Sequence, residues 1–489
     1  MIAAHAATDA ATIRDFVRSL ERFLGSHVDA ARIDRAHAIP AEVLGGLGEL
    51  GVFGVSLPIE HGGCGLGLPG ATAVVEAVAR VDRSVATTIG LHLGLGTRGL
   101  VAFGSDAQHA EFLPGLASGK TIAAFATTEP GAGSDLSRLA TTATLEANGR
   151  LRVVGQKAFV TNGGLAGIYT LTTSSPGLGG AAGQSLVMLR REDGGVDIGR
   201  EEEKLGLRGS STTPIYVDTS VPLSRIVGEP GSGSRLLGHI LAWGRTIMAS
   251  GCAGTARAAL DKTLAHVRNR QQFGKPLGQN AVVRAQVAHM AAELYTMRAL
   301  IALTAADPSD LERRSLAAKV YASDADWRIC DMALQLHGGS GYIEESGIPL
   351  LMRDARITRI FEGANDVLLG RLGLLELVAP RAVTAENSHG PTWRRVTEAC
   401  QGLHARSGLA ALRNAKALHH LGRLVMLREA ADAVLHQTET AATCDPLDAA
   451  LAAHALELLA RAADAIALEP VDFHGTTPIA HLLLDGVDA

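Results

Sequence analysis

Apolar residues recur at helical spacing through the first quarter of the chain. The first stripe consists of Ile13, Phe16, Val17, Leu20, Phe23 and Leu24. Residues three or four positions apart share one face of an α-helix, so this stripe indicates an amphipathic helix. More segments of the same period follow, interrupted by turn-forming residues at 58–65 and 104–106. The pattern predicts an N-terminal helical domain over residues 1–120.

The pattern changes near Thr121 to an alternation of apolar and polar residues. Two alternating segments flank Asn148-Gly149, a dipeptide that favours the type I′ turn of a β-hairpin. Further strand-like pieces cover residues 168–173, 185–191 and 214–221. Gly- and Pro-rich turns separate them. We therefore expect a small antiparallel β-barrel in residues 121–230.

The helical period returns after Pro230. Long helical segments are expected at 234–270, 281–306 and 311–337. The last ends at Gly338-Gly339, as a left-handed helix cap prefers, and short loops between antiparallel helices predict a four-helix bundle in 231–375. A Pro/Gly/Asn-containing linker from Pro380 to Pro391 leads into more helical sequence, so 376–489 is expected to form an extra helical domain. The fold class is mainly α with a central β domain.

Length, charge and cysteine spacing narrow the class of protein. The chain has 489 residues, which suits several domains, and a formal net charge of −5 without a Lys/Arg block argues against nucleic-acid binding. Five cysteines stand far apart without a CxxC pair, so neither a disulfide framework nor a metal site is expected. The amino-terminal residues lack the apolar core of a secretory signal. No apolar run approaches the roughly 20 residues that span a bilayer, and we expect a cytoplasmic protein.

A glycine-rich string at 177–182 tests the possibility of a dinucleotide-binding fold. Its letters match GxGxxA, but Pro176 precedes it and a strand-like segment follows. The dinucleotide fingerprint requires a strand before the glycines and a helix after them. The string is therefore interpreted as a loop between strands.

The segment Thr127–Asp135 carries the first chemical signal. Its small, turn-forming residues (TTEPGAGSD) expose backbone N–H groups that can bind anions or carbonyl oxygens. Further motifs follow one another along the chain at Pro58–Gly65, Gly155–Gly163, Lys204–Arg208, Arg270–Leu277, Gln335–Tyr342, Leu351–Arg356 and Phe361–Asp366. In wording and in order, this series resembles the acyl-CoA dehydrogenase family. The family's fold, helices then a β domain then a helical bundle, agrees with the reading of the hydrophobic pattern.

The resemblance implies an FAD-dependent α,β-dehydrogenation of an acyl-CoA thioester, as in fatty-acid β-oxidation. No side chain accepts a hydride, so such a reaction needs a cofactor. Glu362 matches the family's catalytic base, and burial beside the flavin and acyl chain is expected to raise its pKa. The developing enolate oxygen needs hydrogen-bond donors; the resemblance implies the Glu362 backbone N–H and a flavin hydroxyl.

Other roles carry over from the family motif by motif. Expected flavin contacts in the same subunit are Phe125, Thr127, Thr128, Ser134, Phe159 and Thr161, and Asp366 is a further expected cofactor contact. Expected contacts from a neighbouring subunit are Arg270, Phe273, Gln335, Gly338 and Gly339, which implies a homodimer. Substrate contacts are expected from Ser134, Arg245 and Gly363, and an electron-transfer flavoprotein or a similar acceptor is the implied partner.

Four positions depart from the family pattern. Phe159 stands where many members have Trp beside the flavin, so the wall that meets an electron acceptor differs. Ala242 replaces an acidic residue three positions before Arg245. Ala281 and Ala364 stand where Gln and Thr are common, and each loses a hydrogen-bonding group. None of these changes removes the base.

The C-terminal extension resembles that of the very-long-chain branch of the family. Its Lys and Arg are balanced by Glu and Asp, without the polybasic face that anionic lipids attract, so membrane contact is not expected. The histidines in it, His419 and His420 among them, are expected on solvated helix faces. Acyl length stays open, because Gly94, Gly96 and Gly99 either deepen the acyl site or permit close helix packing.

Other functions remain open alongside the dehydrogenase. An acyl-CoA oxidase would use the same fold and base but pass electrons to oxygen. A dehydrogenase of secondary metabolism would act on a thioester of an acyl-carrier protein. A helical scaffold without a cofactor would make the Gly-rich turns incidental.

Overall fold

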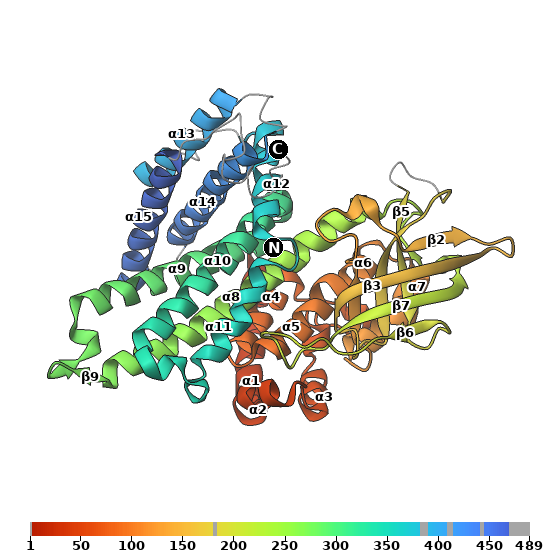
Figure 1. The fold of residues 1–489 in the computed structure, drawn as a ribbon, viewed down its shortest axis with the longest axis horizontal. Helices are drawn as coiled ribbons and strands as arrows, with labels where there is room; N and C mark the ends of the chain where they lie inside the picture. Colours follow the sequence, from red (N-terminus) through yellow and green to blue (C-terminus); the bar gives the residue numbers. More distant parts are fainter. Residues whose placement is uncertain (1, 179–182, 382–389, 408–413, 441–444, 469–489) are drawn as a thin grey trace, which may run out of the picture.

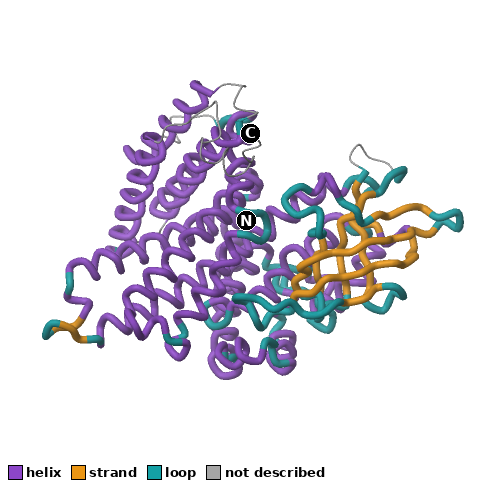
Figure 2. The backbone as a smooth tube through the Cα atoms, viewed as in Figure 1, coloured by secondary structure: helices purple, strands orange, loops and turns teal. Residues whose placement is uncertain are grey.

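The computed structural model describes residues 2–178, 183–381, 390–407, 414–440 and 445–468. Side chains are described from residue 10 onward, in α13 for residues 394–405 and in α15 up to residue 467. Long helices lie on one side of the molecule and the large β-sheet on the other, with further helices behind the sheet (Figure 2). The expected fold class, mainly helical with a central sheet, is confirmed. Two sequence features fall partly outside the described residues: the glycine string at 177–182, of which 179–182 are not described, and the linker at 380–391, of which 382–389 are not described.

The N-terminal part is helical, as the periodicity predicts. Its helices are α1 (Ile2–His27), α2 (Ala30–Ala36), α3 (Ala41–Glu49), α4 (Gly67–Ala79), α5 (Arg83–Leu91), α6 (Thr97–Phe103) and α7 (Asp106–Ala117). A π-helical turn, His92–Gly96, joins α5 to α6. Such turns bulge a helix locally and often occur at functional sites. The buried apolar faces of these helices form one cluster with Phe125, Ile168 and Leu186 of the sheet.

The middle part forms one sheet. Its strands are β1 (Ala123–Ala126), β2 (Thr142–Leu145), β3 (Arg150–Thr161), β4 (Ile168–Ser174), β5 (Gln184–Arg190), β6 (Val196–Ile198), β7 (Thr212–Pro222) and β8 (Ile226–Val227). The spatial order is β6-β7-β3-β2-β4-β5-β8, with β1 paired to β4. The strand-like pieces expected at 168–173, 185–191 and 214–221 are confirmed as β4, β5 and β7.

The prediction of an antiparallel β-barrel was wrong in two respects. Among the described residues the sheet does not close, because the short edge strands β6 and β8 pair only with β7 and β5. The pairing is also mixed, since β1 runs parallel to β4 and β2 meets β4 in a parallel bridge. A parallel pair needs a long crossover, and the hairpin of β2 and β3 supplies it between β1 and β4.

The hairpin at Asn148-Gly149 is confirmed, but its turn type was not predicted correctly. Strands β2 and β3 pair from Thr142↔Val154 to Leu145↔Leu151, which leaves the five residues 146–150 between the last paired positions. Gly149 has φ of 77°, whereas Asn148 is not among the residues with positive φ. A type I′ turn needs positive φ at both central residues. Instead the Asn148 side chain accepts a hydrogen bond from the Arg150 N–H at 2.9 Å, which stabilises a different turn.

Long helices form the remaining core. They are α8 (Gly233–Asn269), α9 (Ala281–Ala306), α10 (Leu311–His337), α11 (Ile348–Arg356) and α12 (Asn365–Val378), with a two-stranded ribbon of β9 (Gln271–Gln272) and β10 (Lys275–Pro276) between α8 and α9. The helices expected at 281–306 and 311–337 coincide with α9 and α10, and that at 234–270 differs from α8 by one residue at each end. Helices α8, α9 and α10 lie side by side (Figure 1); the four-helix count stays a prediction.

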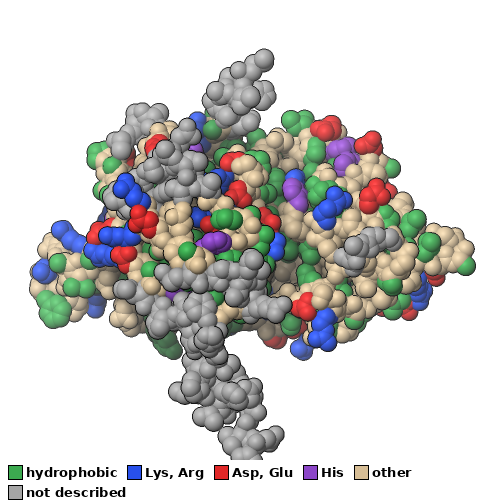
Figure 3. Space-filling model, turned by 90° about the horizontal axis from the view of Figure 1, so that it is seen from above, with side chains coloured by type: hydrophobic (Ala, Val, Ile, Leu, Met, Phe, Trp, Pro, Cys, Tyr) green, Lys and Arg blue, Asp and Glu red, His purple; other side chains and the backbone are tan. Residues whose placement is uncertain are grey.

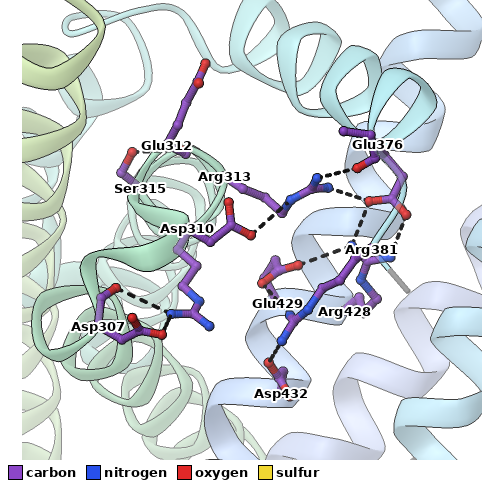
Figure 4. A network of polar contacts seen from close by, with 12 residues as sticks. Asp307, Asp310, Glu312, Arg313, Ser315, Glu376, Arg381, Arg428, Glu429 and Asp432 are labelled. Atoms are coloured by element: carbon purple, nitrogen blue, oxygen red, sulfur yellow. Dashed lines mark hydrogen bonds and ion pairs between the residues drawn. The ribbon is translucent and has the colours of Figure 1, made fainter. Parts of the chain in front are cut away.

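The C-terminal extension packs on these helices through α13 (Gly390–Ser407), α14 (Ala415–Thr440) and α15 (Pro446–Leu468). Buried residues of all three belong to the same apolar cluster as α8, α9 and α10. A buried ion network also joins α10, α12 and α14 (Figure 4). The boundary at residue 376 stays a prediction, and the apolar core is continuous across it.

The charge of the surface and the hydropathy of the helices indicate whether the protein could contact a membrane. Figure 3 looks onto the face that carries the extension, where acidic and basic side chains are interspersed among the described residues. No described helix is long and apolar enough to cross a bilayer. His420, expected on a solvated face, was wrongly placed: it is buried, since α14 is covered by its neighbours.

Candidate active site

A cavity of about 250 Å³ lies where the N-terminal helices, the sheet and the helical core meet. Strands β1 and β3 and the turn after β1 supply one wall, α5 and the π-helical turn a second, and α8 with the loop before α12 a third. The sequence-predicted residues that line it are Phe125, Thr127, Thr128, Ser134, Phe159, Thr161, Arg245, Glu362 and Gly363. Residues far apart in sequence are thus brought together.

Glu362 is the acidic residue in the cavity wall. Its Oε2 atom is buried and has no hydrogen-bond partner. Burial raises the pKa of Glu362 to about 7, and the nearby cations Arg245, Lys319 and Arg83 oppose that rise. A carboxylate poised near neutral pH, without a competing donor, is suited to accept a proton from a ligand in the cavity.

The loop that carries Glu362 is held from two helices. Arg245 of α8 donates from Nε to the Glu362 carbonyl oxygen at 3.2 Å. Lys319 of α10 donates to the Gly363 carbonyl at 2.8 Å and to Asn365 Oδ1 at 2.7 Å. Glu362 itself has φ of 55°, a left-handed conformation that is uncommon outside glycine. Two of these bonds go to main-chain oxygens and one to the Asn365 side chain. Together they hold the strained loop in place, and none of them uses the Glu362 carboxylate.

The glycines near the base allow close helix packing. A Cβ atom on Gly244 of α8 would lie 3.2 Å from Glu362 Oε2 and 2.4 Å from a Leu95 methyl. A Cβ on Gly94 would lie 3.2 Å from the Gly244 Cα, and one on Gly99 would lie 3.0 Å from Ile240. The structure thus favours close packing over extra depth at Gly94 and Gly99.

The sheet side of the cavity is fixed by a buried ion pair. Lys157 on β3 donates to Glu129 Oε1 at 2.7 Å, and Glu129 also accepts from the Ala140 and Thr141 N–H groups. Both side chains are almost completely buried. The pair ties the turn after β1 to β3, beside Thr127 and Thr128. Phe159 on the same strand has φ of 53° and is 65% exposed, so its ring borders the cavity without being packed into the core.

The remaining predicted residues lie elsewhere. Arg270 and Phe273 lie at the β9–β10 ribbon, and Gln335, Gly338 and Gly339 lie at the end of α10. All five are exposed, Phe273 at 96%. Figure 1 places β9 at the end of the molecule opposite the sheet, and none of the five residues lines the cavity of their own chain.

Asp366 is also outside the cavity wall. It is the second residue of α12 and accepts from His419 Nε2 of α14 at 3.1 Å. The departure at Ala364 has a local consequence, because α12 starts there without a side-chain cap. Ala281 begins α9, which the neighbouring Asn280 caps at the Val282 N–H.

Among the described residues, no group of three or more His, Cys, Asp or Glu gathers as a metal site would require.

Sequence matches cover most of the chain. Residues 10–120, 124–220 and 231–373 match the N-terminal, middle and C-terminal domains described for acyl-CoA dehydrogenase. An acyl-CoA dehydrogenase of Bacillus subtilis is 33% identical over 365 residues, which cover 73% of this chain and 93% of that protein. The chain belongs to the acyl-CoA dehydrogenase family. The family consists of FAD-dependent oxidoreductases.

Longer relatives and solved structures extend the comparison. Human mitochondrial very long-chain specific acyl-CoA dehydrogenase is 35% identical over 367 residues, and the chain spans 56% of its length. Butyryl-CoA dehydrogenase from Megasphaera elsdenii has a TM-score of 0.72 at 31% identity, covering 75% of this chain and 98% of that one. A Bacillus anthracis acyl-CoA dehydrogenase complexed with FAD, at 24% identity, covers 97% of this chain and 90% of that one with a TM-score of 0.85. That fold therefore includes a counterpart of the extension.

Some cavity residues had no sequence signal. Arg83 lines the cavity and Lys319 braces the loop of Glu362, yet neither stood out in the sequence. Glu129 and Lys157 were visible inside two quoted motifs. In each motif this residue is a charged one among small and apolar neighbours, and the two charges are opposite. That pattern was the one indication in the sequence that Glu129 and Lys157 form a pair.

Proposed function

We propose that the protein catalyses FAD-dependent α,β-dehydrogenation of an acyl-CoA thioester to the trans-2-enoyl thioester, with Glu362 as the catalytic base. The observation that carries this proposal is the buried Glu362 carboxylate, which lines the cavity without a hydrogen-bond partner. A pKa of about 7 allows it to hold and release a proton near neutral pH. Membership of the family supports the same reaction.

The sheet wall of the cavity fits a flavin. Thr127 Oγ1 is buried there without a hydrogen-bond partner, and the exposed Phe159 ring offers an apolar face beside Thr161. Phe125, Thr128 and Ser134 complete the proposed cofactor wall, and Asp366 is the proposed contact from α12. When bound, FAD supplies the hydride acceptor that no side chain provides.

The chain's own residues hold the base in position and receive the α-proton of the substrate. Glu362 takes the α-proton of the thioester, and Arg245 and Lys319 hold its loop through main-chain oxygens. Substrate contacts are assigned to Arg245, Gly363 and Ser134. Ser134 is exposed at the cavity wall, which suits contact with the CoA arm rather than with the acyl end.

A second copy of the chain completes the proposed cofactor site. Arg270, Phe273, Gln335, Gly338 and Gly339 are exposed far from their own cavity and are assigned to the flavin of the partner subunit. Arg270 suits the cofactor pyrophosphate, whose charge a guanidinium can pair. In this proposal Phe273→Asp weakens both dimerisation and FAD retention, measured by analytical ultracentrifugation and by bound flavin. Leu145→Asp, which alters an exposed apolar residue on the sheet, is the control; equal effects of both changes would contradict the assignment.

An electron-transfer flavoprotein is the proposed electron acceptor. Phe159 borders the cavity and is largely exposed, which places an apolar ring between the proposed flavin wall and solvent. Reduced protein is expected to be reoxidised by an electron-transfer flavoprotein much faster than by oxygen. Rapid formation of hydrogen peroxide would show instead that the protein is an oxidase.

The flavin spectrum tests the reaction as a whole. Purified protein is expected to be yellow, and its flavin band is expected to bleach when acyl-CoA is added without oxygen. Glu362→Gln is expected to bind the same acyl-CoA without bleaching. A yellow protein that bleaches with acyl-carrier-protein thioesters alone would redirect the substrate, and a protein that never retains FAD would overturn the proposal.

A further inference from the structure

A buried guanidinium lies in the cavity wall, and the proposed reaction does not use it. Arg83 is the first residue of α5, is 4% exposed and lines the same cavity as Glu362. Its Nη2 atom makes two long contacts, to the Met248 carbonyl oxygen at 3.4 Å and to Cys252 Sγ at 3.6 Å. Its Nε and Nη1 atoms have no hydrogen-bond partner.

The fold makes room for this side chain. Asp82 caps α5 by accepting from the Val85 N–H at 2.7 Å, which fixes where Arg83 starts. Opposite it, α8 has a glycine in mid-helix: a Cβ atom on Gly251 would lie 1.9 Å from Arg83 Nη1. Any larger residue at 251 would displace the guanidinium. The guanidinium therefore lies against the backbone of α8, in a space that only glycine leaves open.

The charges around Arg83 are not balanced by direct pairing. Arg83, Arg245 and Lys319 all act on Glu362 as nearby cations. A second acidic group that interacts with Arg83 is Asp326 of α10, which is fully buried and accepts from the Cys330 thiol at 3.6 Å, while its Oδ2 atom has no partner. Within the described structure Arg83 forms no ion pair with either carboxylate. A buried charge without a close partner is costly, and an anion that enters the cavity would satisfy it.

We propose that Arg83 is a specificity-determining residue that binds a carboxylate at the far end of the acyl chain, so that the preferred substrates are ω-carboxyacyl thioesters. The inference rests on the proposed function and names the substrate class of the same site. A guanidinium and a carboxylate form strong charge-assisted hydrogen bonds. Val75, Ala86 and Met248 line the same cavity as Arg83, so an acyl chain in this cavity would have apolar side chains beside it.

A purely internal role for Arg83 makes different predictions. If Arg83 only balanced Asp326, loss of either charge would disturb stability, and substrate preference would not change. If Arg83 binds the substrate carboxylate, Asp326→Asn keeps the preference, because the cation remains and a competing anion is gone. The two roles are therefore separated by the ratio of two substrates measured on one variant.

The test compares acyl-CoAs of equal carbon number with and without a terminal carboxylate, from five to eight carbons. Wild-type protein is expected to show kcat/KM at least about tenfold higher for the ω-carboxyacyl member of the best pair, as one hydrogen bond to a charged group predicts. In Arg83→Met this ratio is expected to fall to about one or below. The Glu362→Gln variant provides a readout without turnover: calorimetry is expected to show tighter binding of the ω-carboxyacyl ligand, and Arg83→Met is expected to remove that difference.

Control variants separate the outcomes. Arg98→Met removes another partly buried arginine, whose pKa burial lowers and whose guanidinium lies over the Trp243 ring, outside the cavity wall. This variant is expected to keep the wild-type ratio. If Arg83→Met does not fold, Arg83→Lys retains the charge with a different reach and is expected to lower the ratio. A wild-type protein that prefers the unsubstituted acyl-CoA, or an Arg83→Met ratio equal to wild type, would overturn this inference alone. Failure of every acyl-CoA to reduce the flavin would instead overturn the proposed function.

Discussion

Two residues of the cavity wall, Phe159 and Glu362, have left-handed backbone conformations with φ of 53° and 55°. A non-glycine residue in this region costs roughly 1–3 kcal/mol and persists only where its surroundings hold it. At Glu362 the surroundings are Arg245 and Lys319, which donate to the carbonyl oxygens of Glu362 and of the next residue, Gly363. Such strain at a buried acid is typical of a site in which side-chain position matters more than local stability.

The raised pKa of Glu362 predicts opposite effects of pH on activity and on stability. The carboxylate is the active form, so kcat/KM should rise with pH and level off above about 7. Ionisation of the buried acid disfavours folding, because the folded protein holds this proton more tightly than the unfolded chain does. Stability from this group is therefore lost as pH rises from about 4.5 to 7.

Glu362→Gln removes that loss. Relative to wild type, the variant should gain stability between pH 5 and pH 8 by at most about 3 kcal/mol, as the size of the shift implies. Denaturant unfolding at both pH values, with FAD content matched, measures the difference. A stability difference that does not change with pH would contradict the burial of the charged form.

Lys319 should affect the base through position and charge together. It is completely buried, and burial lowers its pKa to about 8. Lys319→Met removes both loop contacts and one cation near Glu362, so we expect kcat/KM to fall by about one to two orders of magnitude and the kinetic pKa to rise. Lys262→Met, which removes an exposed lysine bonded to the Ser346 carbonyl, should change neither. A loss of activity without a shift of the pH profile would limit Lys319 to a structural role.

For individual residues, the sequence prediction and the structure agree where the residue belongs to a contiguous motif. Glu362, Phe159 and Thr127 stand in contiguous motifs, and the structure brings them to one cavity. Lys319 and Arg83 could not be predicted, because their importance comes from contacts between helices. Lys319 meets a carbonyl group 44 residues further along the chain, and no local pattern encodes such a contact.

Long elements were predictable and short ones were not. Helices α9 and α10 extend over about seven turns each, so their period is unambiguous, and their ends carry the caps Asn280 and Gly338. Strands β6 and β8 have three and two residues, too few to show alternation. The parallel pairing of β1 with β4 depends on which strands meet in space, which alternation within a strand does not determine.

The crossing of α12 and α14 depends on two glycines. A Cβ atom on Gly373 would lie 2.0 Å from the Leu418 carbonyl oxygen, and one on Gly422 would lie 1.9 Å from the Leu369 carbonyl oxygen. Gly373→Ala should push the helices apart and destabilise the protein by about 1–3 kcal/mol, as overpacking does. Gly370→Ala lies in the same helix with nothing within 4 Å of its Cβ and should be neutral or stabilising. Denaturant unfolding compares the two; equal destabilisation would contradict the close crossing.

At the scale of the whole molecule, a buried ion network attaches the extension to the helical core (Figure 4). Glu376 of α12 accepts from both terminal nitrogens of Arg428 on α14, at 2.8 and 2.7 Å, and also pairs with Arg313 of α10. The pKa of Glu376 stays below its usual value, because Arg428 and Arg313 outweigh the effect of burial. Three helices are therefore coupled through one carboxylate.

Glu376→Gln should consequently be far more damaging than loss of a surface pair. It leaves Arg428 and Arg313 buried with less negative charge, and breaking a buried pair costs about 3–5 kcal/mol. Glu312→Gln removes an exposed partner of Arg371 and should cost less than about 1 kcal/mol. Urea unfolding at pH 7 measures both. A small effect at Glu376 would mean that apolar packing alone holds the extension.

Proton exchange tests the central claim, that Glu362 removes the α-proton of an acyl thioester, most directly. A 3-thiaacyl-CoA, with sulfur at the β position, has an α-proton but no β-hydride to transfer, so only the first step can occur. In D₂O the FAD-loaded wild-type protein is expected to exchange the α-protons of this ligand, followed by NMR, and Glu362→Gln is expected to bind it without exchange. Exchange at the wild-type rate in Glu362→Gln would contradict the assignment of the base.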